Sequence, residues 1–74
     1  MGVFTGKKLF DLTDREFEVL NFMVQGKSNP QIASLLFVSD NTAKAHVSKV
    51  MVKLKTSNRV EAVVKAIKEN IIQL

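Results

Sequence analysis

Residues 26–47 contain two short helical patterns joined by a turn of three or four residues. A serine, Ser28 or Ser39, precedes each pattern, and serine often caps a helix by accepting a backbone hydrogen bond. Gln31 stands three residues after Ser28, as a capping box requires, and Pro30 falls in the first turn, where a missing N–H group is harmless. Two capped helices at this spacing predict a helix-turn-helix.

Similar signals elsewhere extend the prediction to an all-α, four-helix bundle that contains this helix-turn-helix. Thr13 and Asn58 precede the first and last helical patterns, and Glu16 and Glu61 are placed to close their capping boxes. Gly26 stands where a left-handed residue ends the first helix. The predicted helices span about residues 14–25, 29–36, 40–54 and 59–70.

The 74 residues leave room for one small domain, which we assign to residues 12–74. Residues 1–11 carry no helical periodicity and are expected to form a flexible N-terminal segment, and residues 71–74 a short tail. Phe37 and Val38 form an apolar pair in the turn of the helix-turn-helix. Burial of this pair would fix the angle between the two helices.

Positive charge is concentrated in the segment that holds the helix-turn-helix. The chain has a formal net charge of +4 at pH 7. Residues 27–59 contain six basic side chains and one acidic side chain, a net charge of +5, whereas residues 1–26 carry −1 and residues 60–74 carry no net charge. This clustering favours a polyanionic partner over a surface with scattered charge.

The predicted third helix has two different faces. Its apolar positions advance by four, three and four residues and form the inner face: Ala43, Val47, Val50 and Leu54. Rotation by about 100° per residue puts small and amide side chains opposite them: Asn41, Ala45, Ser48 and Val52. Three lysines flank this outer face: Lys44, Lys49 and Lys53. One helix fits the major groove of DNA, where small side chains can approach base edges and lysines can reach phosphates or guanine. Double-stranded DNA is therefore the expected partner, and an ordinary solvated amphipathic helix is the alternative.

Other kinds of function find little support. The chain has no cysteine, a single histidine, His46, and no glycine-rich phosphate loop, so we expect no enzyme, no metal site and no cofactor. No apolar run approaches the roughly 18 residues that a membrane span needs, and the N-terminus does not resemble a signal peptide. We therefore expect a cytoplasmic protein without a membrane partner.

The predicted fourth helix is apolar on two sides. Ala62, Val63 and Ala66 suffice to pack it against the domain. A second stripe follows at spacings of four, three and four residues: Val60, Val64, Ile67 and Ile71. A helix with two apolar sides in so small a domain usually has a partner, which suggests a homodimer through this stripe. Burial of both stripes inside one domain is the alternative.

Four successive blocks resemble one known family: residues 12–20 (LTDREFEVL), 26–33 (GKSNPQIA), 38–47 (VSDNTAKAHV) and 53–62 (KLKTSNRVEA). Together they are similar to the LuxR/NarL/FixJ/GerE-type helix-turn-helix DNA-binding domain, and the resemblance extends over about residues 12–70. It implies a bacterial transcription regulator, or the output domain of one such as a response regulator, that binds DNA through its third helix and dimerises through its fourth.

The resemblance also implies which residues meet DNA. The family's contact positions fall on residues of the third helix, with Lys44 and Ala45 at the base-contacting places: Thr42, Lys44, Ala45, Ser48 and Lys49. The implied partners are DNA, RNA polymerase and a second copy of the chain. The two copies can pair when both are bound to DNA, even if the free domain stays a monomer. A different interpretation stays open, in which the fourth helix makes the chain an interaction module that modulates another regulator without binding DNA.

Three positions depart from the family pattern. Ala43 stands where valine is usual, so packing under the third helix could be looser by a methyl group or two. Gln31 replaces glutamate and keeps the capping hydrogen bond. Lys55 stands where glycine is common, and it would carry strain if its backbone were left-handed.

Overall fold

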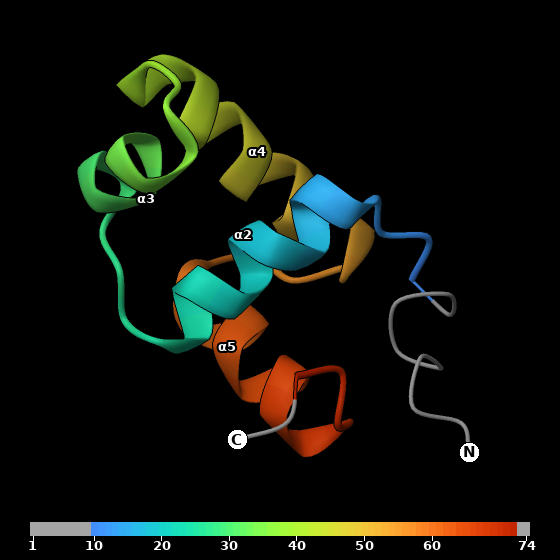
Figure 1. The fold of residues 1–74 in the computed structure, drawn as a ribbon. Coiled ribbons are helices and arrows are strands. Elements are labelled where there is room, and N and C mark those ends of the chain that lie inside the picture. The colour runs from blue at the N-terminus through green and yellow to red at the C-terminus, as the bar shows by residue number, and fades with distance from the viewer. Residues whose placement is uncertain (1–9, 73–74) are drawn as a thin grey trace.

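A computed structural model describes residues 10–72 of the chain, and this part holds four α-helices and no strand. The helices are α2 (Asp14–Val24), α3 (Asn29–Leu36), α4 (Asp40–Lys53) and α5 (Arg59–Lys68). Figure 1 shows α3 beside the start of α4 at one end of the molecule, α5 at the other end, and α2 between them. The predicted all-α, four-helix fold is confirmed. The predicted flexible segment and tail fall largely on residues 1–9 and 73–74, outside the described residues.

The helices begin where the polar caps predict. The Thr13 side chain accepts a hydrogen bond from the Glu16 N–H group, and the Ser28 side chain accepts one from Gln31, each with the reciprocal bond of a capping box. Ser39 caps α4 by accepting from the Thr42 N–H group at 3.1 Å. These bonds satisfy N–H groups that the first turn of a helix leaves without partners.

The start of α5 differs in one detail from the predicted capping box. Asn58 accepts a hydrogen bond from the Glu61 N–H group at 2.9 Å, as expected. The Glu61 carboxylate, however, accepts from the N–H group of Ser57 rather than that of Asn58, at 2.8 Å. The cap is therefore made, but the reciprocal bond reaches one residue further back.

Left-handed residues end several helices. Gly26 has φ = 85°, a conformation that costs glycine little because it has no Cβ. Lys55 has φ = 59° and is left-handed as well, so its backbone carries the strain that was expected for a lysine in this conformation. Phe37 ends α3 with φ = 59° and is 94% exposed, so the apolar pair of Phe37 and Val38 is not buried together. Val38 alone packs against the core from this turn.

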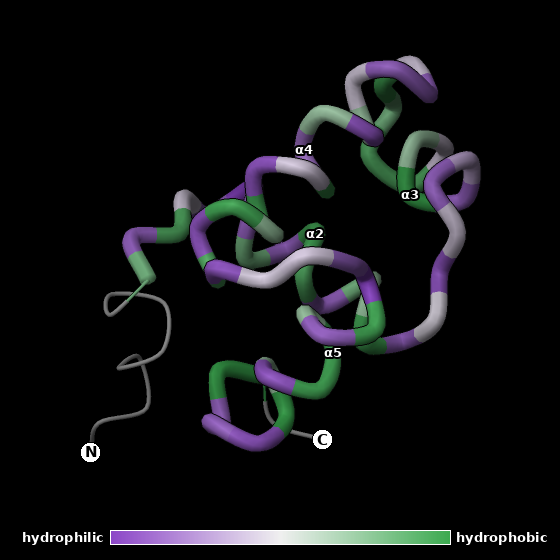
Figure 2. Tube along the Cα trace, turned by 180° about the vertical axis from the view of Figure 1, so that it is seen from behind, coloured by the Kyte–Doolittle hydropathy of each residue, from purple (hydrophilic) through white to green (hydrophobic). Residues whose placement is uncertain are grey.

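The core is formed by one face of each helix, and in Figure 2 hydrophobic residues recur at intervals along the helices. The inner face of α4 is buried as its spacing predicts, and Ala43 is fully covered. Residues from all four helices and both flanking segments contribute: Leu12, Val19, Leu20, Met23, Ile32, Ala33, Leu36, Ala43, Val47, Val50, Leu54, Ala62, Ala66, Ile71 and Ile72.

The chain reverses direction after α5, which overturns the prediction for Ile71. Asn70 is left-handed at φ = 56°, so the helix ends at Lys68 instead of continuing to residue 70. The Ile71 N–H group then donates to the Ala66 carbonyl at 2.9 Å, and the Ile71 side chain is only 5% exposed. Ile71 therefore belongs to the core and not to the exposed stripe of the fourth helix.

A buried carboxylate joins the start of α2 to the end of α4. Glu16 Oε1 accepts from the Thr13 N–H group at 2.9 Å and from Lys53 Nζ at 2.7 Å. Lys53 Nζ also donates to the Asp11 carbonyl at 2.8 Å. Burial raises the pKa of Glu16, but the hydrogen bonds from Lys53 and Thr13 and the charge of Lys53 outweigh it, so that the pKa lies below its ordinary value of 4.5.

We expect Glu16→Gln to lower the free energy of unfolding at pH 7 by about 1–3 kcal/mol, because it leaves the Lys53 ammonium without its counter-ion. A lowered pKa in the folded state means that the unfolded state binds more protons. The parent protein should therefore lose stability as the pH falls from about 4.5 through the folded pKa of Glu16, and the variant should lose less. Urea unfolding at several pH values measures both effects.

Glu18→Gln serves as the control, because Glu18 is exposed and, among residues 10–72, forms an ion pair only with Arg15 of its own helix, at 3.7 Å. Its effect should stay within about 0.5 kcal/mol. Equal pH dependence in the parent and in Glu16→Gln would contradict the assignment.

Candidate nucleic-acid interface

The outer face of α4 is open to solvent along the helix. Six of the seven residues that sequence analysis assigned to DNA binding are exposed there: Asn41, Thr42, Lys44, Ala45, Ser48 and Lys49. The three core residues of α4, Ala43, Val47 and Val50, alternate with them at helical spacing and hold the opposite face inside the domain. The 14 residues of α4 give a rod about 21 Å long that projects one continuous surface outward.

The composition of this surface suits close approach to a polyanion. Ala45 and Ser48 are short, so the backbone of α4 can come near another molecule without obstruction. Lys44 and Lys49 are exposed beside them and carry the positive charge. The Ser39 hydroxyl donates to the Thr42 hydroxyl at 2.9 Å, which fixes two polar side chains at the N-terminus of α4.

A shallow groove runs between the start of α2 and the second half of α4. It has a volume of about 470 Å³ and is lined by side chains from both helices: Thr13, Glu16, Ser48, Lys49, Val52 and Lys53. Val52 is largely exposed at this groove and adds an apolar surface beside Ser48. This groove borders the outer face of α4 on the side that faces α2.

The structure places Lys53 differently from its predicted neighbours. Lys53 was predicted to flank the DNA-facing side, but its ammonium group is engaged by Glu16 and by the Asp11 carbonyl. Contact with a phosphate would require it to give up a half-buried ion pair. These bonds fix the end of α4 to the start of α2, and the predicted contact of Lys53 with DNA stays a prediction.

Two further cations that contribute to the basic character of the sequence serve as internal ties. Arg59 donates to the Asn29 side chain at 3.2 Å and to the carbonyl of Lys27, and so connects the start of α5 to the start of α3. Lys65 donates to the Leu54 carbonyl at 2.8 Å, and its ammonium lies 5.1 Å from the centre of the Phe10 ring. Lys44 and Lys49 remain as the exposed lysines of α4.

These internal ties were missed in the sequence because their partners are far apart. Glu16 was recognised as a capping residue, yet nothing in the local pattern signals that a lysine 37 residues later contacts it. The same holds for Arg59, whose partners lie some 30 residues earlier. Only the packing of the helices brings these side chains together.

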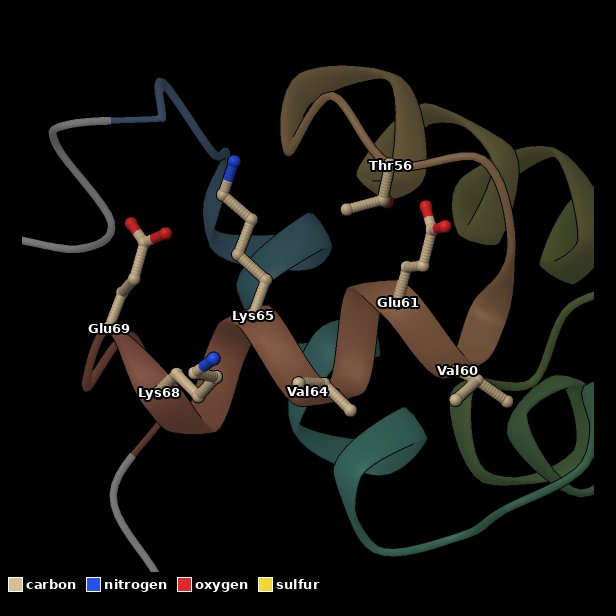
Figure 3. A pocket seen from close by; sticks show the side chains of 7 residues that line it. All are labelled: Thr56, Val60, Glu61, Val64, Lys65, Lys68 and Glu69. Carbon is tan, nitrogen blue, oxygen red and sulfur yellow. The ribbon is translucent and has the colours of Figure 1, made fainter.

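A second exposed surface lies on α5, on the side away from the core. Val60, Val64 and Ile67 are 72%, 46% and 38% exposed, which is unusual for three aliphatic side chains on one short helix. Val60 and Val64 line a groove of about 550 Å³ together with charged side chains of α5, and Figure 3 shows the residues that line it: Thr56, Val60, Glu61, Val64, Lys65, Lys68 and Glu69.

Within residues 10–72 no group of three or more acidic, cysteine or histidine residues could hold a metal ion, and no helix is long and apolar enough to cross a membrane. His46 is half-buried on α4.

Residues 11–66 match the family described as bacterial regulatory proteins, luxR family. Among curated relatives, the transcriptional regulatory protein YhcZ of Bacillus subtilis is 43% identical over 65 residues, which cover 88% of this chain and 30% of YhcZ. The transcriptional regulatory protein DegU of Brevibacillus brevis is 45% identical over 62 residues, which cover 84% of this chain and 26% of DegU. The chain thus spans less than a third of the length of either relative.

A solved structure agrees with these matches. The crystal structure of the response regulator ChrA, from a haem-sensing two-component system, is similar to this chain with a TM-score of 0.75 and 38% sequence identity. The similarity covers 81% of this chain and 30% of ChrA. Sequence and fold therefore lead to the same group of proteins.

Proposed function

Because this chain belongs to the luxR family of bacterial regulatory proteins, we propose that it binds double-stranded DNA in the bacterial cytoplasm by placing the outer face of α4 in the major groove. Its relatives YhcZ and DegU are transcriptional regulators, and the corresponding role for this chain is that of a DNA-binding output domain. RNA polymerase is a further candidate partner. Members of this family are regulatory proteins, and we propose no catalytic role for His46.

The observation that carries this proposal is the exposed, short-chained and lysine-flanked face of α4. A major groove about 12 Å wide admits one helix, provided that the helix stands clear of its own domain. Ala45 and Ser48 let the helix approach base edges, and Lys44 can donate to guanine acceptors. Lys49 and Thr42 can hold phosphates and fix the helix in register.

Selection of bound sites from a random pool of duplexes tests the proposal. A sequence-specific reader enriches a common site, whereas an interaction module without DNA affinity enriches none. The same selection distinguishes this function from the alternative in which the chain only modulates another regulator through α5.

We also propose that two copies associate through α5. The three exposed aliphatic side chains of this helix, Val60, Val64 and Ile67, would leave water on pairing, at roughly 25 cal/mol for each Å² buried. The patch is small, so association of the free domain should be weak. Adjacent half-sites on DNA would strengthen it by raising the effective concentration of the second copy.

The first prediction for this function concerns salt. The logarithm of the binding constant should fall linearly with the logarithm of salt concentration, with a slope of about −0.9 per phosphate contacted. Lys49→Ala should reduce the magnitude of the slope by up to about one, because one phosphate contact is lost. Fluorescence anisotropy on a single half-site measures the slope, with Lys68→Ala on α5 as the control. Binding that does not respond to salt would exclude the phosphate contacts.

A second prediction concerns sequence preference. Lys44→Ala should lower the affinity for the selected site by about 1–3 kcal/mol and relax the preference at one base pair, while affinity for unrelated DNA changes much less. Competition between the selected duplex and its single-base variants measures this preference. Full retention of site preference in Lys44→Ala would mean that the bases are read by other residues.

A third prediction concerns assembly. Val64→Lys should keep the helix content, because Val64 lies outside the core, and should abolish cooperative occupancy of a duplex with two half-sites. Circular dichroism measures the first property, and binding isotherms on single and paired half-sites measure the second. Unchanged cooperativity would exclude α5 as the dimer surface.

A further inference from the structure

The outer surface of α5 has an apolar side and a charged side. Figure 3 shows Val64 facing outward from the middle of the helix, with Glu61 towards its start and Lys68 towards its end. At about 100° per residue, Val60 and Ile67 lie about 40° and 60° to one side of Val64. Glu61 and Lys68 lie about 60° and 40° to its other side. The two aliphatic residues and the two opposite charges thus form parallel rows on either side of Val64.

The two charges on this surface do not neutralise each other. Glu61 and Lys68 are separated by two turns of the helix, about 10 Å along its axis, which is too far for an ion pair. Glu61 Oε1 accepts the Ser57 N–H group, and Glu61 makes no ion pair with any residue from 10 to 72. Lys68 makes no ion pair with any residue from 10 to 72. Each charge is therefore available to a partner molecule.

We infer that two copies of the chain pair antiparallel along α5, with Val64 at the two-fold axis and Glu61 of each copy against the partner's Lys68. This inference rests on the proposed homodimer and adds its orientation and register. A two-fold axis perpendicular to the helix reverses the ends of α5 but keeps each row on its own side. Val60 then meets the partner's Ile67, and both ion pairs form at once.

A parallel arrangement of the two helices is less favourable. A two-fold axis along α5 would exchange the two rows, so that Val60 would face the partner's Glu61 and Ile67 would face the partner's Lys68. Aliphatic groups would then remove water from charges without pairing them. The charge pattern of α5 therefore matches itself only in the antiparallel orientation.

The remaining cation in the charged row does not disturb this pairing. Lys65 lies between Glu61 and Lys68 in the sequence, about 100° from Val64, and its ammonium already donates to the Leu54 carbonyl. It also lies over the Phe10 ring, which draws it away from the helix surface that would face the partner. The opposite charges at the two ends of the row therefore decide the orientation.

Charge reversal tests the register. Lys68→Glu places two carboxylates opposite each other in both symmetric contacts, and Glu61→Lys places two ammonium groups there. Each variant alone should dimerise about three- to tenfold more weakly than the parent, as expected for exposed charge pairs. An equimolar mixture of the two should recover association, because the heterodimer restores two attractive contacts. Sedimentation equilibrium and cooperativity on paired half-sites measure these changes.

Glu69→Lys is the matched control. It makes the same change of charge on the same helix as Glu61→Lys, but about 140° away from Val64, and should leave association unchanged. Circular dichroism checks that each variant folds, since Glu61 also receives the Ser57 hydrogen bond. If the mixture does not recover association, although Val64→Lys abolishes association of the parent, the register is overturned but the homodimer is not. No association of the parent, free or on DNA, would overturn both.

Cross-linking gives a second test that does not depend on Glu61. The sequence contains no cysteine, so single substitutions report one contact each. Oxidation of a mixture of Val60→Cys and Ile67→Cys should give mainly mixed dimers, because these positions face each other in the antiparallel register. Disulfides formed mainly between two copies of Val60→Cys would overturn the proposal.

Discussion

The buried carboxylate of Glu16 is the interaction on which the arrangement of this domain depends. It closes the cap of α2 and receives the ammonium of Lys53, which also binds the Asp11 carbonyl, so that the start of one helix and the end of another share one polar cluster. A buried ion pair adds little net stability, but removal of one partner is costly, which makes it effective in fixing an orientation. The bonds of Lys53 hold the C-terminal end of α4 in the domain. Lys44 and Lys49 lie exposed on the outer face of the same helix.

The two surfaces of the domain are separated by its core. α4 turns Ala43, Val47 and Val50 inward and its lysines outward, and α5 turns Ala62 and Ala66 inward and its exposed valines outward. Lys65 and Arg59 connect the α5 backbone to the end of α4 and to the start of α3. In the proposed dimer on DNA, contact through α4 and pairing through α5 can therefore proceed together, and the angle between α4 and α5 would set how the two copies of α4 lie relative to each other.

Local signals predicted most of the fold, because caps and helical periods depend on neighbouring residues. Thr13, Ser28, Ser39 and Asn58 begin the four helices as predicted. Errors arose where distant contacts decide the outcome. The spacing of Ile71 predicted one more exposed position of α5, but the left-handed turn at Asn70 carries it into the core. Helical spacing alone does not show where the helix ends and the chain turns back. The ion pair between Lys53 and Glu16 could not be predicted either, because the two residues lie 37 positions apart in the sequence.

We propose that the outer face of α4 meets DNA, and a titration followed by NMR shows which surface of the domain responds to a duplex. Amide resonances of the ¹⁵N-labelled protein are recorded as a selected duplex is added at moderate salt. We expect the largest changes on α4 and its cap, centred on Thr42, Ala45 and Ser48, with little change along α2. Changes concentrated on α5, or spread evenly over the domain, would contradict it.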